Sequence, residues 1–114
     1  MTAPPVTDPA HQADFMDAFE PAVLDDLLDQ FLAAIDREGA AILACEQAGD
    51  RSGLEQAAHR LASAAGQFGF PELTAVARAL EAGRVSAAQS DLRACLARAT
   101  IAAASLQRRP TAAR

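Results

Sequence analysis

The sequence of 114 residues contains no tryptophan, no tyrosine and no lysine, and aromatic residues make up only 4% of it. Residues that favour strands are therefore scarce, whereas 30 residues are alanine, which has the highest helix propensity. A chain of this length is large enough for one hydrophobic core but not for two. These proportions predict a single all-α domain.

The sequence also has fewer basic residues than acidic ones. The ten basic residues, all arginine, are outnumbered by 15 acidic residues, so the formal net charge is −5. A nucleic-acid backbone would repel such a surface, and we expect no nucleic-acid partner. The sequence also has no apolar run of about 18 residues, and it begins with a polar, proline-rich stretch rather than a signal peptide. We therefore expect a cytoplasmic protein that does not enter membranes.

Motifs for metal binding and nucleotide chemistry are missing as well. Cys45 and Cys95 form no CxxC motif and no cluster with histidine, so both are expected to be reduced thiols without a metal. The sequence has no GxxxxGKS/T phosphate loop, no glycine-rich kinase loop and no close Ser, His and Asp constellation. We therefore expect no bound cofactor, and a chain that is not an enzyme with its own nucleotide site.

Apolar residues recur at helical spacing in four segments. The first covers residues 21–48, and the second begins at a capping box formed by Ser52 and Glu55 and ends near Gly69. A third helix is expected to open at Pro71, where a missing N–H costs nothing.

The third predicted helix ends at Gly83, and a second capping box, formed by Ser86 and Gln89, leads into a fourth that continues to about Gln107. Short connections between four amphipathic helices are typical of bundles. The sequence therefore predicts an antiparallel up-down four-helix bundle.

The two ends of the chain are expected to lie outside this bundle. Residues 1–10, with three prolines, are predicted to be a flexible leader, and residues 108–114 a flexible tail. Between them, residues 11–107 form the predicted domain, in which residues 11–19 make a short additional helix that caps one end of the bundle. His11 lies in this short helix and is given no chemical role.

The second predicted helix carries a histidine, His59, near its middle. Apolar residues on one side of that helix form the stripe expected to face the core: Leu54, Ala58, Leu61, Ala65 and Phe68. His59 points away from this stripe, and the residues that stack with it one and two turns further on are small: Ala62, Ser63 and Gly66. The sequence therefore predicts an exposed imidazole on a surface that another protein can approach.

The surroundings of His59 resemble those in the histidine phosphotransfer (HPt) family, whose members carry a phosphoryl group on one histidine between a histidine kinase and response-regulator receiver domains. In that family an alanine usually precedes the histidine, a leucine follows two residues later, a glycine follows after ten, and a Leu-Glu pair closes the next helix. Here these places are filled by Ala58, Leu61, Gly69, Leu80 and Glu81. The resemblance extends over about residues 21–107 and implies a four-helix bundle with His59 as the phosphoryl acceptor.

Two positions depart from the family's pattern. The family usually has a lysine three residues after the histidine and a glycine four residues after it, where this sequence has Ala62 and Ser63. The lysine would help to neutralise a phosphoryl group, which carries roughly two negative charges near pH 7. A serine hydroxyl can donate a hydrogen bond to a phosphoryl oxygen, but it also adds bulk near an incoming receiver.

Other residues near His59 are candidates for supporting roles, each with a plainer alternative. Arg60 could reach the phosphoryl group only with its long side chain, and otherwise it lies on a solvated face. Glu81 is a candidate to accept a hydrogen bond from the imidazole and so fix its tautomer. A surface ion pair between Glu81 and Arg78 or Arg84 is an equally good prediction.

The remaining candidates lie further along the same helix. Ser63 and Gln67 are candidate hydrogen-bond donors to the phosphoryl group, with Gln67 turned about 80° from His59. Ala62 and Gly66 are expected to form a docking surface, since neither obstructs a partner.

Three functions follow as hypotheses. The first is a histidine-containing phosphotransfer protein that relays a phosphoryl group through His59, with the acceptor aspartate and Mg²⁺ supplied by the receiver. The second is a transfer-deficient module of the same fold that docks receivers or kinases without carrying phosphate, with Ala62 and Ser63 as the marks of that loss. The third is a scaffold bundle that pairs through exposed alanine faces, and a stable homo-oligomer would favour it because the first two predict a monomer.

Overall fold

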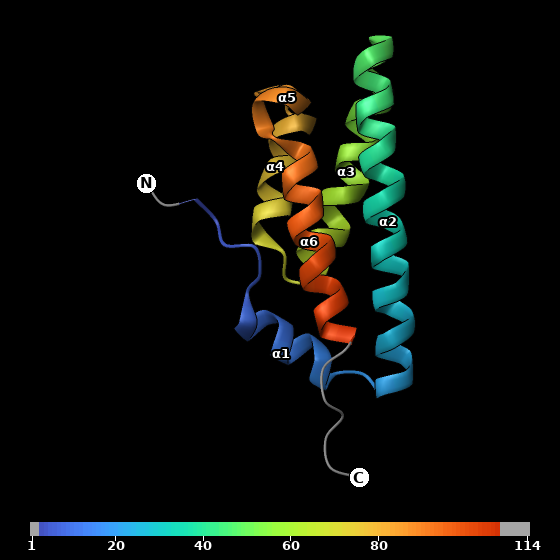
Figure 1. The fold of residues 1–114 in the computed structure, drawn as a ribbon, viewed down its shortest axis with the longest axis vertical. Coiled ribbons are helices and arrows are strands. Elements are labelled where there is room, and N and C mark those ends of the chain that lie inside the picture. The colour runs from blue at the N-terminus through green and yellow to red at the C-terminus, as the bar shows by residue number, and fades with distance from the viewer. Residues whose placement is uncertain (1–2, 108–114) are drawn as a thin grey trace.

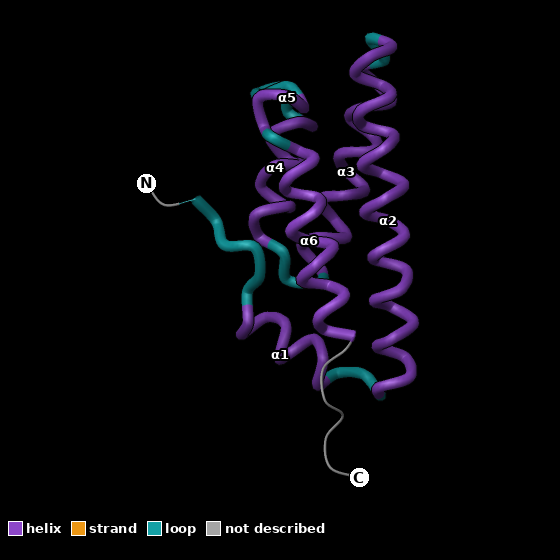
Figure 2. The backbone as a smooth tube through the Cα atoms, viewed as in Figure 1, coloured by secondary structure: helices purple, strands orange, loops and turns teal. Residues whose placement is uncertain are grey.

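The computed structural model describes residues 3–107, and within that range helices joined by loops and turns make up the fold, with no strand (Figures 1 and 2). The described residues form helices α1 Pro9–Asp17, α2 Pro21–Ala48, α3 Arg51–Gln67, α4 Pro71–Glu81, α5 Ala87–Ser90 and α6 Leu92–Gln107. The all-α class predicted from the composition is confirmed. The predicted tail, residues 108–114, lies outside the described residues.

Four of these helices surround the core. Helix α2 packs against α3 on one side and α6 on the other, and α4 contacts both α3 and α6. The chain rises along α2, returns along α3, rises along α4 and returns along α6 (Figure 1). Because α3 and α4 run side by side in opposite directions, residues from the middle of α3 face residues from the second half of α4.

Large apolar side chains from all four helices fill the centre of the bundle. The most deeply buried are Phe31, Phe70, Leu24, Leu28, Ile35, Ile42, Leu61, Leu73, Leu80 and Leu92. The Phe31 ring stacks on the Phe68 ring with centroids 4.6 Å apart. Each such side chain contributes about 1.5–3 kcal/mol when it leaves water, which holds the helices in fixed register.

Helix α2 has the predicted bounds because strong local signals mark both ends. Pro21 occupies its first turn, and Gly49 follows its last residue with a φ of 70°, a left-handed conformation that glycine adopts without steric cost. The start of α3 was predicted wrongly. Asp50, rather than Ser52, caps the helix by accepting a hydrogen bond from the Gly53 amide at 2.9 Å.

The predicted fourth helix is interrupted. The capping box of Ser86 and Gln89 is confirmed, but it caps the four-residue helix α5. Asp91 then takes a left-handed conformation with a φ of 53°, and α6 starts at Leu92. Aspartate tolerates this conformation better than most residues, so the break carries no obvious sequence signal.

The N-terminal segment is attached to the bundle, in contrast to the predicted leader. The Asp8 amide donates to the Gly69 carbonyl at 2.9 Å, and the Glu72 amide donates to the Pro5 carbonyl at 2.9 Å. Helix α1 starts at Pro9, two residues earlier than predicted, and lies across one end of the bundle (Figure 1). His11, which was given no role, places Nε2 2.8 Å from the Gln67 carbonyl oxygen and so helps to hold α1 on the end of α3.

Candidate functional site

The exposed side of α3 presents His59 close to the middle of the helix. Its side chain is 64% exposed, and it neighbours Ala58, which is fully buried. Helical hydrogen bonds on both sides hold the backbone here, so the imidazole leaves the surface in a defined direction. The predicted outward orientation of His59 is confirmed.

A carboxylate from α4 holds one nitrogen of this imidazole. His59 Nδ1 lies 2.9 Å from Glu81 Oε2, in the last turn of α4. When Nδ1 carries the proton and donates it to the carboxylate, Nε2 keeps its lone pair. Nε2 has no hydrogen-bond partner within residues 3–107 and is open to solvent. The alternative pairing of Glu81 with Arg78 or Arg84 does not occur in this part of the chain.

Arg60, next to His59, is bonded to a different helix. Its Nε lies 3.0 Å from Glu38 Oε2 and its terminal nitrogen lies 3.0 Å from Glu38 Oε1, a two-point contact with α2. Arg37 adds a further contact with Glu38 at 3.2 Å. The Arg60 guanidinium still borders the shallow, open pocket beside His59, but its hydrogen-bonding directions toward Glu38 are occupied.

Glu38 itself is a buried acid, with only 3% of the residue exposed. Burial alone would raise the pKa of its carboxyl group, but hydrogen bonds and charge from Arg60 and Arg37 outweigh that effect and lower the pKa below its ordinary value. The sequence analysis missed this residue. Its position three residues after Ile35 and four before Ile42 places it on the apolar stripe of α2, which is the signal that could have found it.

One of the two predicted docking residues is not on the surface. Ala62 is only 1% exposed, because α4 covers the side of α3 on which it lies. A residue three positions after His59 is turned about 60° from it, and that turn is toward α4. The prediction that Ala62 belongs to the exposed docking surface is therefore wrong, whereas Ser63 and Gly66 are exposed as expected.

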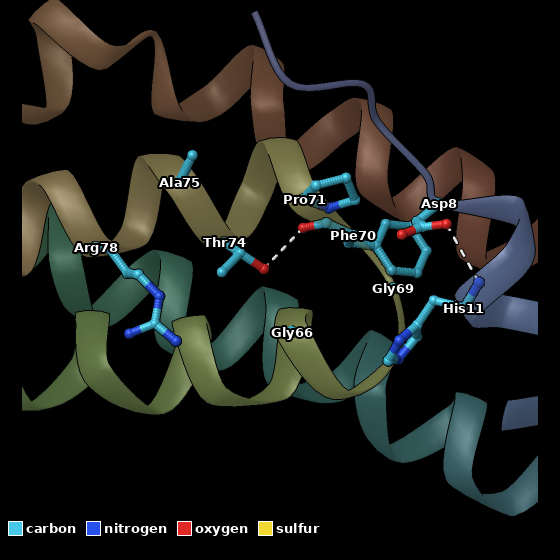
Figure 3. A pocket seen from close by; sticks show the side chains of 9 residues that line it. All are labelled: Asp8, His11, Gly66, Gly69, Phe70, Pro71, Thr74, Ala75 and Arg78. Atoms are coloured by element: carbon cyan, nitrogen blue, oxygen red, sulfur yellow. Dashed lines mark hydrogen bonds between the residues drawn. The ribbon is translucent and has the colours of Figure 1, made fainter.

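Gly66 borders a pocket between α3, α4 and the N-terminal segment. The pocket is also lined by Asp8, His11, Thr74 and Arg78 (Figure 3). A Cβ atom added at Gly66 would lie 3.9 Å from Thr74 Oγ1, an ordinary contact distance. The two helices therefore approach closely here, and because Gly66 has no side chain, nothing projects from this part of the α3 surface.

The two polar candidates on α3 point in different directions. Ser63, one turn after His59, makes no side-chain hydrogen bond within the described residues. Gln67 instead lines a separate pocket between α2 and α3, beside Leu27 and Phe68. Ser63 therefore lies near His59, whereas Gln67 lies on the side of α3 that faces α2.

Residues 3–107 contain no group of three or more histidine, cysteine or acidic side chains placed to hold a metal ion. Burial, followed by the nearby charge of Glu72, raises the pKa of the Cys95 thiol to about 12, so it is protonated at neutral pH. None of the described helices is long and apolar enough to cross a membrane.

Comparison with protein families identifies the class of domain. The Hpt domain family matches residues 21–107, which is more than half of the chain, and the chain therefore belongs to this family. The resemblance noted in the sequence is confirmed, and the family's role in histidine phosphotransfer within two-component phosphorelays applies to this chain. Comparisons with curated proteins and with solved structures found no match.

Proposed function

We propose that this protein carries a phosphoryl group covalently on His59 Nε2 and exchanges it with the aspartate of a response-regulator receiver domain. The observation that carries this proposal is the uniqueness of His59. The chain has two histidines, and His11 precedes the segment that matches the Hpt domain family. His59 is the one within that segment, and its side chain is exposed.

The surroundings of His59 suit a nucleophilic nitrogen. With Nδ1–H directed at Glu81, the lone pair on Nε2 attacks the phosphorus of the receiver's aspartyl phosphate. A nitrogen–phosphorus bond forms, the phosphorus–oxygen bond to the aspartate breaks, and the aspartate leaves as a carboxylate. The positive charge that develops on the imidazole lies 2.9 Å from Glu81 and is stabilised by it. The reverse reaction returns the group to a receiver.

The other components of the reaction belong to the partner. We infer that Mg²⁺ is bound by the receiver and neutralises the phosphoryl oxygens during transfer, while this chain contributes the histidine. The chain is then a phosphoryl carrier rather than an enzyme, and a histidine kinase is the source of the phosphoryl group. A rigid mid-helix histidine supports this proposal because it offers the same geometry to several partners.

Chemical labelling tests the proposal without knowledge of the natural partner. The purified chain is treated with phosphoramidate, a small donor that phosphorylates histidine, and in parallel with phosphorylated receiver domains and Mg²⁺. With the receiver as donor, we expect acid-labile, alkali-stable labelling of the wild type and of His11→Gln, but none of His59→Gln. Equal labelling of His59→Gln and wild type by a receiver would overturn the site assignment.

The transfer-deficient module gives a different result in the same experiment. Such a protein would bind the receivers without becoming labelled by any of them. Binding by titration calorimetry without labelling would therefore replace the phosphoryl carrier by a docking module.

A further inference from the structure

A phosphoryl group on His59 needs positive charge beside it, and α3 supplies little. The family's usual lysine position holds Ala62, which has no charge and is buried. Arg60 is bound to Glu38. Arg51, two turns before His59, is bound to Glu55 and to the carbonyl groups of Leu80 and Glu81 at the end of α4.

Arg78 on α4 is in a different situation. It is exposed, and it forms no hydrogen bond or ion pair with any residue of the described range 3–107. Figure 3 shows its side chain leaving α4 and pointing toward α3, on the same side as the pocket that Gly66 borders. It is therefore an uncommitted cation on the α4 side of the α3 surface.

Two contacts fix which part of α3 faces Arg78. His59 Nδ1 lies 2.9 Å from Glu81 Oε2, and a Cβ atom added at Gly66 would lie 3.9 Å from Thr74 Oγ1. Arg78 lies between Glu81 and Thr74, three and four residues from them, so the three share one side of α4.

The helices run in opposite directions, so the register can be followed from either contact. Counting three residues forward from His59 along α3 gives Ala62, and counting three residues back from Glu81 along α4 gives Arg78, so these two residues lie opposite each other. Counting four residues back from Gly66 along α3 and four residues forward from Thr74 along α4 gives the same two residues. Arg78 therefore stands across from the place where the family's lysine would be.

We propose that the Arg78 guanidinium, supplied by α4, binds the phosphoryl group on His59 Nε2 and replaces the positive charge that α3 lacks. This inference rests on the proposed function. Arg78 is one helical turn from Glu81, about 4.5 Å along the axis, which is within the reach of an arginine side chain. Its planar donors suit phosphoryl oxygens, and no bond to Arg78 forms or breaks during transfer.

This placement also gives a physical reason for Ala62. A lysine at that position would bring a second cation against Arg78, whereas alanine allows α4 to pack closely and cover it. The charge has moved from one helix to its neighbour while its position relative to the histidine is kept.

The first test measures the rate of phosphoryl transfer from a phosphorylated receiver in the presence of Mg²⁺. We expect Arg78→Ala to slow transfer about tenfold and Arg78→Lys only a few-fold, as removal of a charged donor predicts at an exposed site. The matched control is Arg84→Ala, an exposed arginine just after α4 with no side-chain partner within the described residues, and it should transfer like wild type.

A second measurement distinguishes phosphoryl binding from a structural effect. In ³¹P spectra of the chain phosphorylated by phosphoramidate, a nearby cation favours the dianion, so Arg78→Ala should raise the pKa of the phosphoryl group by about 0.5, while Arg84→Ala leaves it unchanged.

The outcomes separate this inference from the proposed function. If the wild type is labelled on His59 but Arg78→Ala matches Arg84→Ala in rate and pKa, Arg78 does not bind the phosphoryl group and the carrier function stands. If the wild type is never labelled on His59, the proposed function fails first.

Discussion

Two adjacent residues of α3 each bond to a glutamate from a neighbouring helix. His59 reaches Glu81 on α4, where the glutamate side chain is 32% exposed, and Arg60 reaches Glu38 on α2, where the glutamate side chain is 4% exposed. The Arg60 pair replaces water around a buried acid and so belongs to the stability of the fold. The His59 pair leaves one ring nitrogen in solvent, where it is available to a partner. Both pairs join a side chain of α3 to a glutamate, and they differ in how deeply the glutamate is buried. The buried glutamate makes the Arg60–Glu38 pair part of the fold's stability, whereas the more exposed His59–Glu81 pair is available for chemistry with a partner.

The largest effects are expected when His59 is replaced, which the labelling experiment above measures, and when the charge of Glu38 is removed. Glu38→Gln should lower the free energy of unfolding by about 1–2 kcal/mol near neutral pH, because the two arginines lose their charged partner. Since the pKa of Glu38 is lowered in the folded state, its contribution is present above the ordinary value of 4.5 and is lost as the pH falls through the folded value. Urea unfolding from pH 7 to pH 3 measures both effects.

The control for this change is Glu55→Gln. Glu55 pairs with Arg51 at 3.1 Å, but half of its side chain is exposed, so its removal should change the stability by less than about 0.5 kcal/mol. A Glu38→Gln protein whose unfolding free energy stays equal to that of Glu55→Gln at every pH would contradict the structural role of the buried pair.

Glu81→Ala should affect chemistry rather than stability. Without the carboxylate, the tautomer of His59 is no longer fixed and the positive charge on the ring is not stabilised, so phosphoryl transfer should slow by about tenfold. The melting temperature should change little, because this is an exposed pair. Transfer assays and thermal unfolding on the same samples measure the two properties.

Glu81→Gln sharpens the same point, since it keeps an acceptor for Nδ1–H but removes the charge. Its transfer rate should lie between those of wild type and Glu81→Ala. A rate for Glu81→Ala equal to that of wild type would show that the His59 contact with α4 has no part in transfer.

The smallest effect is expected at Gly66, where α3 and α4 approach each other. Gly66→Ala should stabilise the fold by about 0.5–1 kcal/mol, because alanine favours the helix and its Cβ makes only ordinary contacts with Thr74. The same methyl group raises the surface two turns from His59, so receiver binding should weaken slightly. Urea unfolding and titration calorimetry measure these opposite changes, and a destabilised variant would show that the helices are packed too tightly there.

Much of the fold could be predicted because local signals set the ends of the helices. Pro21 and Gly49 marked both ends of α2 correctly, since their backbone preferences act without help from distant residues. The break at Asp91 and the docking of Pro5 and Asp8 against the α3–α4 turn were missed, because they depend on contacts made after the chain has folded.

In the candidate site, the sequence placed some residues correctly and others wrongly. Helical periodicity placed His59 on the exposed side of α3 and excluded it from the core. The resemblance to the HPt family made Glu81 a candidate partner of His59, but an ion pair of Glu81 with Arg78 or Arg84 was an equally good prediction, and the structure decided for His59. Periodicity alone could not place Ala62, because a residue at the edge of a helix face is exposed or buried according to how far the neighbouring helix extends over it. Nor could it show that Arg60 turns away to α2.

By itself, the sequence determined an all-helical chain, the side of α3 on which the histidine lies, and its membership of the Hpt domain family. These properties depend on backbone propensity and on spacing within single segments, which act locally. Only the tertiary structure decided which charges are free: it bound Arg60 to Glu38, set Glu81 against His59 and left Arg78 unpaired across from Ala62 within the described residues. Pairing between helices depends on their relative register, and that register is fixed by how the buried side chains of different helices pack together.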